Sequence, residues 1–351
     1  MARTKNLCVD LIPVTVLTGF LGSGKTTILA QLVQNPAFAD TAIIINEFGE
    51  VGLDHALLEA SDESIVDLSC GCICCTIRGD LVSTLTNLYE RRTCGEIQEF
   101  KRVVIETTGL ADPAPIIHTL MQEPKVFDNY RLARVVTTID AVNGMRVLDH
   151  NPEAIKQVAM ADTLLITKND INDPLGIAPL TDRLDGLNPG AVRSICIHGE
   201  TDPMYFFSGG IYDPSEKGRD VSNWLTKEAA SSPHNHHSDI NRHGSGIQTF
   251  SLLRTKAISR SALAIFMQML ADQKGDDLLR LKGLVHLIEN SEWPAVVHGV
   301  QHVIHPIKRL YAWPDNIVQT RLVFIVQGIE KEWVEDLLNK VTDSAYAGLS
   351  V

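Results

Sequence analysis

The chain has 351 residues, of which 44% are hydrophobic and 21% are charged. This length is comfortable for two domains, and the composition is ordinary for a globular protein with a substantial core. The formal net charge of −12 argues against non-specific nucleic-acid binding, which depends on Lys and Arg side chains that neutralise phosphates. No stretch holds the roughly 18 uninterrupted apolar residues that a membrane helix needs. We therefore expect neither nucleic acid nor membrane among its partners.

The first part of the chain, residues 1–208, alternates short apolar runs with amphipathic stretches. This alternation is typical of a mostly parallel sheet covered by helices on both faces, and it indicates the α/β class. Strands are predicted over residues 13–18, 41–46, 64–68, 102–106, 133–139, 163–167 and 191–197. Helices are predicted over residues 24–34, 80–91, 113–121 and 174–187. Ligands of such sheets bind at the carboxyl ends of the strands.

The pattern then dissolves into a polar linker over residues 209–246, with one helix expected at residues 221–230. The linker contains His234, His236, His237 and His243, and whether this tract captures metal is left open. A smaller α+β domain is predicted over residues 247–351. Its expected strands are residues 247–253, 284–288, 295–304 and 321–326, and its expected helices are residues 260–273 and 331–341.

Residues 19–26 read Gly-Phe-Leu-Gly-Ser-Gly-Lys-Thr, which fits the phosphate-binding pattern G-x-x-x-x-G-K-[ST] in full. An apolar strand precedes the motif and a helical pattern follows it, as a P-loop NTPase requires. The glycines let backbone N–H groups turn toward phosphates at the start of a helix. Lys25 is expected to reach the β- and γ-phosphates, and the Thr26 hydroxyl is expected to ligate Mg²⁺. The predicted contacts with the nucleotide are made by Gly22, Ser23, Gly24, Lys25, Thr26 and Thr27.

Residues 167–170 read Thr-Lys-Asn-Asp and follow a buried strand. A carboxylate at Asp170 accepts both the N1–H and the N2 amino group of guanine, a donor pair that adenine lacks. The stem of Lys168 lies against the base. The usual GTPase motif begins with Asn where this chain has Thr167, so one amide that braces the loop is lost. We predict GTP as the nucleotide, and an ATP-using kinase with a structural zinc remains an alternative.

Two further strands end in carboxylates. Residues 103–109 read Val-Val-Ile-Glu-Thr-Thr-Gly, so that Glu106 closes an apolar strand and Gly109 follows three residues later. Glu106 is predicted to hold the metal's water shell or to orient the attacking water, and the Gly109 N–H to meet the γ-phosphate. Glu47 follows the second strand and is predicted to lie near Mg²⁺, in a mobile loop over residues 46–54. The predicted catalytic residues are therefore Lys25, Glu106 and Glu47.

Four of the seven cysteines fall at positions 70, 72, 74 and 75. Such crowding favours metal or redox chemistry in a reducing compartment, and hence the cytoplasm. Cys72, Cys74 and Cys75 can converge on one thiophilic ion, because soft thiolates select Zn²⁺ or Cu⁺ over Mg²⁺. Three sulfurs leave a fourth position open, as a carrier needs, whereas Cys70 as the fourth ligand would close a structural site.

In this order the motifs resemble those of the CobW-type metal-chaperone GTPases, relatives of the nickel-loading GTPases of urease and hydrogenase. The quoted segments are the phosphate loop, Asn-Glu-Phe-Gly at residues 46–49, Gly-Cys-Ile-Cys-Cys at residues 71–75 and Glu-Thr-Thr-Gly-Leu-Ala-Asp-Pro at residues 106–113. His298, His302 and residues 320–324 resemble the family's smaller second domain. The resemblance implies that Cys72, Cys74 and Cys75 bind zinc or cobalt and that GTP gates the transfer. It further implies that residues 198–199 lie near the base or near an extra metal site.

The sequence thus predicts a GTP-dependent metallochaperone that uses GTP, Mg²⁺ and Zn²⁺ or Co²⁺ and delivers the ion to a client metalloprotein. Its turnover is expected to be slow without a partner or metal, because no arginine finger is evident. A non-enzymatic zinc buffer or sensor, stabilised by nucleotide, is the alternative. His298 and His302 are four residues apart on a predicted strand and should share one face, where core or surface histidines are expected more often than ligands. Homo-oligomerisation is left open.

Overall fold

The computed structural model describes residues 11–46, 65–67, 73–76, 81–171, 176–207, 246–305, 307–314 and 316–347. Within these ranges the first part of the chain forms an eight-stranded sheet with the order β3-β4-β2-β5-β1-β6-β7-β8. All neighbours in it are parallel except β3 and β4. The strands are β1 (Ile12–Gly19), β2 (Thr41–Asn46), β3 (Ile65–Asp67), β4 (Ile73–Thr76), β5 (Arg102–Thr107), β6 (Tyr130–Asp140), β7 (Thr163–Thr167) and β8 (Val192–Ile195).

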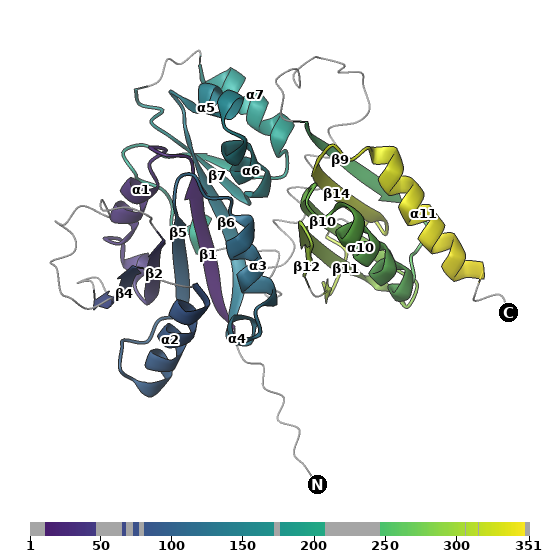
Figure 1. Ribbon diagram of the computed structural model, residues 1–351, viewed down its shortest axis with the longest axis horizontal. Helices are drawn as coiled ribbons and strands as arrows, with labels where there is room; N and C mark the ends of the chain where they lie inside the picture. The colour runs from purple at the N-terminus through teal and green to yellow at the C-terminus, as the bar shows by residue number, and fades with distance from the viewer. Residues whose placement is uncertain are drawn as a thin grey trace, which may run out of the picture.

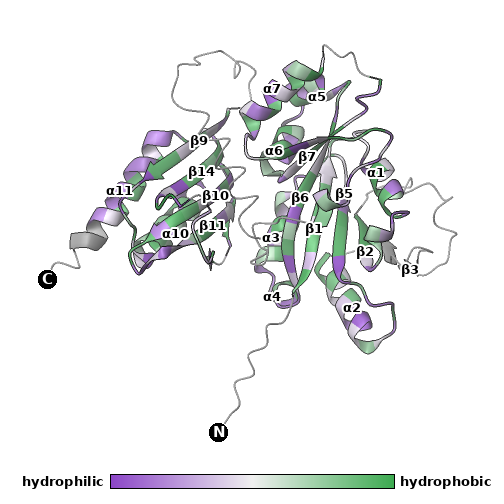
Figure 2. Cartoon of the chain, turned by 180° about the vertical axis from the view of Figure 1, so that it is seen from behind, coloured by the Kyte–Doolittle hydropathy of each residue, from purple (hydrophilic) through white to green (hydrophobic). Residues whose placement is uncertain are grey.

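Helices cover both faces of this sheet. Successive side chains of a strand point to opposite faces, and in this sheet both sets are apolar and enter different hydrophobic clusters. In β2, Ala42 and Ile44 belong to one hydrophobic cluster, and Ile43 and Ile45 belong to another. The helices are α1 (Lys25–Leu32), α2 (Leu81–Cys94), α3 (Ala114–Gln122), α4 (Pro124–Phe127), α5 (Gly144–His150), α6 (Pro152–Met160), α7 (Ile177–Leu187) and α8 (Met204–Phe207), with a 3₁₀ turn at Pro36–Phe38. Figure 2 shows the hydrophobic colour along β1, between the helical layers. The predicted α/β class is confirmed.

The C-terminal part forms a second, antiparallel sheet with the order β12-β11-β10-β14-β9 and β13 paired to β11. Its strands are β9 (Ile247–Arg254), β10 (Leu278–Leu287), β11 (Asn290–Val300), β12 (Val303–Ile304), β13 (Lys308–Arg309) and β14 (Thr320–Gln327). Helices α10 (Arg260–Lys274) and α11 (Lys331–Ala347) pack on one face of this sheet. Figure 1 shows the sheet between α11 and the first domain.

The other face of the C-terminal sheet is buried against the first domain. Ile247, Leu279, Val300, Val303 and Ile325 belong to the same hydrophobic cluster as the core of the first domain. The two sheets therefore share one apolar core, although they belong to different parts of the chain.

A buried ionic group crosses the same interface. Asp162 Oδ1 accepts hydrogen bonds from Arg280 Nη2 at 2.5 Å and from Lys282 Nζ at 2.6 Å. Burial alone would raise the pKa of Asp162, but the charges of Arg280, Lys282 and Arg134 hold it far below its usual range. Burial, with the charge of Arg280, lowers the pKa of Lys282 to about 8. Breaking such a group by removing one partner would leave an uncompensated buried charge, which is strongly destabilising.

The predicted elements are mostly found within a few residues of their expected bounds, and the exceptions have physical causes. β10 begins six residues before its predicted start. Its first residues were not predicted because Arg280 and Lys282 interrupt the apolar pattern. In the structure both side chains bond to Asp162 of the first domain. The predicted strand at residues 295–304 is wrong: Gln301, with φ 52°, turns the chain between β11 and β12. Among the described residues, elements that were not predicted include α4, α5, α6, α8, β4 and β13. The predicted helix at residues 221–230 lies outside the described residues.

No helix in the described ranges combines the length and the apolar character needed to cross a membrane.

His298 gives the fold a testable pH dependence. Its side chain is buried in β11 opposite Lys282, and burial lowers its pKa from 6.5 to about 4. Because the unfolded chain binds a proton that the folded ring rejects, stability should fall as the pH drops from about 6.5 to about 4, by up to about 3 kcal/mol. Urea unfolding across this range should show a shallower pH slope for His298→Gln than for wild type. Exposed His150→Gln is the matched control and should keep the wild-type dependence of unfolding free energy on pH. The same dependence in His298→Gln as in wild type would contradict this assignment.

Candidate functional site

The phosphate loop joins the end of β1 to the start of α1. Gly22 and Gly24 adopt φ values of 71° and 94°, a left-handed conformation that favours glycine and lets the loop turn. Lys25 is the first residue of α1, and its ammonium donates to the carbonyl oxygens of Gly19 at 2.9 Å and Phe20 at 3.3 Å. The lysine is therefore folded back over the loop, where a phosphate group would compete for the same donor.

Hydroxyl groups from two neighbouring strands brace this loop. Thr167 Oγ1 at the end of β7 donates to the carbonyl of Ser23 at 2.8 Å, and the Ser23 hydroxyl lies 2.6 Å from Thr138 Oγ1 in β6. From the motif alone, Thr167 in place of Asn predicts the loss of one amide that braces the loop. The structure corrects this, because the threonine hydroxyl itself bonds to the loop from the position where the motif usually has Asn.

Glu106 lies beside the phosphate loop. It is buried at the end of β5, and its Oε1 accepts a hydrogen bond of 2.8 Å from the Thr26 hydroxyl. A carboxylate and a hydroxyl in contact supply the hard oxygen donors that Mg²⁺ prefers, so these residues fit that ion. Gly109 packs on the loop so closely that a Cβ there would lie 2.6 Å from the backbone nitrogen of Leu21. Glu47 lies outside the described residues.

The residues predicted to read the base come together at the ends of β7 and β8. Lys168 adopts φ 57°, and its ammonium is 2.8 Å from Asp140 Oδ2. His198 Nδ1 lies 3.7 Å from Asp170 Oδ2, and Gly199 packs against Thr27. The carboxylate of Asp170 and the lysine stem therefore lie on the same edge of the sheet as the phosphate loop.

Asp140 is a site residue that the sequence reasoning missed. Burial alone would raise its pKa, but hydrogen bonds from Lys168, Asn143 and the Val142 backbone outweigh burial and hold its pKa below the usual value. An acidic residue that ends a central apolar strand was the signal, and the same signal identified Glu106. Its charge fixes the ammonium of Lys168.

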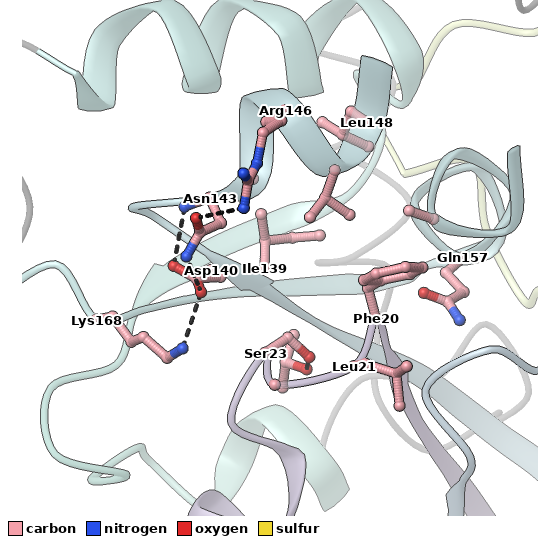
Figure 3. Close-up of a pocket in the computed structure, with 15 residues that line it drawn as sticks. Phe20, Leu21, Ser23, Ile139, Asp140, Asn143, Arg146, Leu148, Gln157 and Lys168 are labelled. Atoms are coloured by element: carbon pink, nitrogen blue, oxygen red, sulfur yellow. Dashed lines mark hydrogen bonds and ion pairs between the residues drawn. The ribbon is translucent and has the colours of Figure 1, made fainter. Parts of the chain in front are cut away.

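A cavity of about 260 Å³ lies between the phosphate loop and the segment from Thr138 to Gln157. Figure 3 shows Phe20 and Leu21 on one side of it, Arg146 and Leu148 on another, and Gln157 beside Phe20. Gly22, Ser23 and Lys168 of the predicted nucleotide site also line the cavity. Gln157 carried no signal in the sequence, because the helix that contains it, α6, was not predicted.

The backbone of Cys74 and Cys75 lies within β4, a strand that the sequence reasoning did not predict. β4 runs parallel to β2, with Cys74 opposite Ile43 and Cys75 opposite Ile44. In the sheet order, β4 is separated from β5 by β2 alone, and from β1 by β2 and β5. Cys70 and Cys72 are outside the described residues. Within the part of the chain that is described, no group of three or more His, Cys, Asp or Glu side chains is suited to hold a metal.

The expectation that His298 and His302 share one strand face is wrong. His298 lies in β11, whereas His302 lies in the turn before β12, because the chain reverses at Gln301. His302 has both ring nitrogens engaged, with the carbonyl of Ala271 and with Asp276, each at 2.9 Å. The side chain of Asp276 raises the pKa of His302. These two histidines are therefore not neighbours on one face.

A complete phosphate loop on the central strand of a mostly parallel sheet, with Glu106 and the 167–170 segment at the same edge, defines a protein with the P-loop GTPase fold. The chain belongs to the CobW/HypB/UreG family: the nucleotide-binding domain of that family matches residues 13–192. The cobalamin synthesis protein CobW C-terminal domain matches residues 247–342. The predicted family is confirmed.

Relatives match this chain over lengths that range from about half of it to almost all of it. The zinc chaperone YjiA of Escherichia coli is 30% identical over 344 residues, which cover 96% of this chain and 98% of that protein. The crystal structure of the Zn(II)-bound YjiA GTPase from E. coli superposes with a TM-score of 0.75 at 29% identity, covering 94% of this chain and 99% of that one. The zinc-regulated GTPase metalloprotein activator 1 of Schizosaccharomyces pombe is 34% identical over 170 residues, which are 46% of this chain and 40% of that protein.

The bracing role of Thr167 can be tested with Thr167→Val, which keeps the shape of the side chain and removes its hydroxyl. The buried Ser23 carbonyl then loses its partner, so nucleotide affinity should fall about tenfold. Calorimetric titration with GDP measures this change. Thr181→Val in α7 removes a hydroxyl that bonds only within its own helix and is the matched control. Equal affinities in wild type and Thr167→Val would show that the hydroxyl does not shape the loop.

Proposed function

We propose that the protein is a GTP-dependent metallochaperone that binds Zn²⁺ or Co²⁺ at Cys72, Cys74 and Cys75 and passes it to a client metalloprotein. The observation that carries this proposal is the near full-length similarity to a zinc chaperone in a chain that retains the cysteine motif. The protein's parts are proposed as residues 1–208, a linker at 209–246 and a C-terminal domain at 247–351.

The nucleotide part of the proposal rests on the contacts around the phosphate loop. Lys25 is placed to neutralise the β- and γ-phosphates once it leaves the carbonyls of Gly19 and Phe20. Mg²⁺, when bound, would be held by Thr26, with Glu106 and Glu47 toward its water shell, and would neutralise the developing phosphate charge. Glu106 is buried beside Thr26, and this contact supports a role for its carboxylate in holding the metal's water shell or in orienting the attacking water.

Guanine selection is assigned to Asp170, with the stem of Lys168 against the base. The salt bridge to Asp140 limits the positions that the lysine ammonium occupies, and so orients its stem. Because Asp170 is partly buried, its carboxylate can compete with water for the two guanine donors.

The metal part of the proposal depends on β2, which links the two sites. Ile45 of β2 is in register with Thr76, directly after Cys75, and also with Glu106 of β5. Neighbouring strands lie about 4.8 Å apart, so the cysteine strand and the Glu106 strand are about 10 Å apart across β2. β2 also leads into residues 46–54, where the nucleotide-sensing loop is expected. A shift of β2 is a direct route between nucleotide state and metal affinity.

A zinc buffer or sensor, in which nucleotide only stabilises the fold, is the second candidate. It is favoured by the contacts of Lys25 with its own loop carbonyls, because a phosphate that displaces these contacts has only to bind and need not be hydrolysed. The two functions differ in whether metal affinity changes with the γ-phosphate.

A metal titration in three nucleotide states tests the chaperone. We expect the affinity for Zn²⁺ to differ at least fivefold among the nucleotide-free, GDP and non-hydrolysable GTP analogue states, a coupling of typical size. Lys25→Ala should bind Zn²⁺ but lose this dependence and its GTP hydrolysis. A Cys72→Ser, Cys74→Ser, Cys75→Ser variant should lose the zinc site and keep nucleotide binding, which serves as the folding control.

One outcome would favour the buffer: a zinc affinity that is the same in all three states, with GTP hydrolysis in wild type no faster than in Lys25→Ala. Zinc binding that survives the triple cysteine substitution would instead move the metal site elsewhere.

Asp170→Asn tests the choice of base. The amide accepts only one guanine donor and presents an N–H group to the other, so GTP affinity should fall roughly 100-fold while affinity for xanthosine triphosphate rises. Competition against a labelled GTP analogue measures both. Exposed Asp202→Asn, beyond the end of β8, is the matched control. An Asp170→Asn variant with unchanged preference for GTP over ATP would remove Asp170 from the base site.

A further inference from the structure

Gln157 is a buried residue of α6 that the nucleotide-site motifs do not include. It is 1% exposed, and its Nε2 donates to the carbonyl oxygens of Gly109 at 3.2 Å and Ala111 at 3.0 Å. Two carbonyl acceptors fix which end of the amide is the nitrogen. Its Oε1 is buried without a hydrogen-bond partner among the described residues, and Figure 3 shows it directed toward Phe20. The residue is therefore committed to holding one backbone segment.

That segment lies against the phosphate loop. Gly109 approaches the backbone of Leu21 so closely that a Cβ would lie 2.7 Å from the Leu21 Cα. The turn is closed by Ala111, whose N–H donates to the Thr108 carbonyl at 3.2 Å. A group that enters beside Leu21, as a γ-phosphate would, must therefore act on the segment that Gln157 holds.

The same helix is attached to the C-terminal domain. Met160 ends α6, and its carbonyl accepts a hydrogen bond from Arg280 Nη1 of β10. Gln157 and Met160 are three residues apart, which is less than one helical turn of about 3.6 residues. Arg280 is held in turn by Asp162, whose partly buried carboxylate also accepts a hydrogen bond from Lys282.

A second contact joins the C-terminal sheet to the other side of the segment. α3 follows residues 109–112 in the chain, and His118 Nε2 of α3 lies 3.1 Å from the Val300 carbonyl of β11. Lys156 of α6 is 3.0 Å from Asp112. Both helices that flank the segment are therefore in contact with the C-terminal domain.

We propose that Gln157 is a positioning residue that holds residues 109–111 for the γ-phosphate, and that α6 transmits the occupancy of that position to the C-terminal domain through Arg280. The inference rests on the proposed function, because it requires GTP to bind at the phosphate loop. We call the two hydrogen bonds from Gln157 to this segment the clamp. Without the clamp, residues 109–111 become ordered only when the γ-phosphate binds, and the conformational entropy lost in that step weakens GTP binding. GDP lacks the γ-phosphate, so its affinity is left unchanged.

Gln157→Met tests the clamp, because methionine keeps the length of the side chain and cannot donate to the two carbonyls. Calorimetric titrations with GDP and with a non-hydrolysable GTP analogue should show that preference for the GTP analogue falls about fivefold, the size expected from lost hydrogen bonds. Gln268→Met, on the exposed face of α10, is the matched control and should leave both affinities unchanged.

Tryptophan emission tests the relay, by which we mean the transmission from residues 109–111 through α6 and Arg280 to the C-terminal domain. The four tryptophans are Trp224, Trp293, Trp313 and Trp333, and none lies in residues 1–208. A change in their emission on binding the GTP analogue therefore reports on the region after the first domain. We expect this change to be larger with the GTP analogue than with GDP in wild type, and to disappear in Gln157→Met at saturating nucleotide.

Equal factors of change for GDP and the GTP analogue in Gln157→Met would reduce Gln157 to a structural residue and overturn the proposal. Tryptophan emission that does not distinguish the two nucleotides in wild type would overturn the relay. If Gln157→Met does not fold, Gln157→Glu replaces it. The ionised carboxylate repels the carbonyls of Gly109 and Ala111, whereas the protonated carboxyl can donate to one of them. The preference of Gln157→Glu for the GTP analogue should therefore recover at low pH. Absence of any GTP-analogue binding in wild type would instead reject the proposed function itself.

Discussion

Side-chain hydroxyl groups at the carboxyl ends of the central strands hold the phosphate loop in place, and the rest of the site is arranged around them. Thr138 of β6 contacts the Ser23 hydroxyl, and Thr167 of β7 bonds to the Ser23 carbonyl. Thr107 of β5 bonds to Thr18 at the end of β1. Such contacts exist only if four parallel strands keep a fixed register, and the apolar cores on both faces of the sheet maintain that register. The shape of the loop therefore depends on the packing of the sheet against the helices on both of its faces.

The charges of the site are distributed by the same geometry. Lys25 and Lys168 are both drawn to acceptors of the protein, the first to loop carbonyls and the second to Asp140. Lys168 is therefore oriented before a ligand arrives, which lowers the conformational entropy lost on binding, whereas Lys25 must first leave its loop carbonyls. Glu106 accepts a hydrogen bond from the Thr26 hydroxyl, in the first turn of α1.

Much of this arrangement could be predicted from the sequence, because the signals were local. The glycines and lysine of residues 19–26, and the apolar strands that end in Glu106 and Thr167, predicted the loop, the sheet and the edge where the motifs meet. What failed depended on contacts between distant segments. The start of β10 was hidden because Arg280 and Lys282 look like solvent-facing residues until Asp162 is placed beside them. The bracing hydroxyl of Thr167 and the clamp at Gln157 likewise depend on which carbonyl lies opposite, and no local pattern records that.

The shared core between the two sheets sets the scale of motion that the molecule can use. Swinging the C-terminal sheet away would expose Ile247, Leu279 and Ile325 to water and strip Asp162 of its cations. Both costs oppose wide opening at a flexible joint. We therefore expect any conformational coupling across the interface to be a shear motion, in which packed helices slide by about an ångström, and not a hinge closure of the two domains.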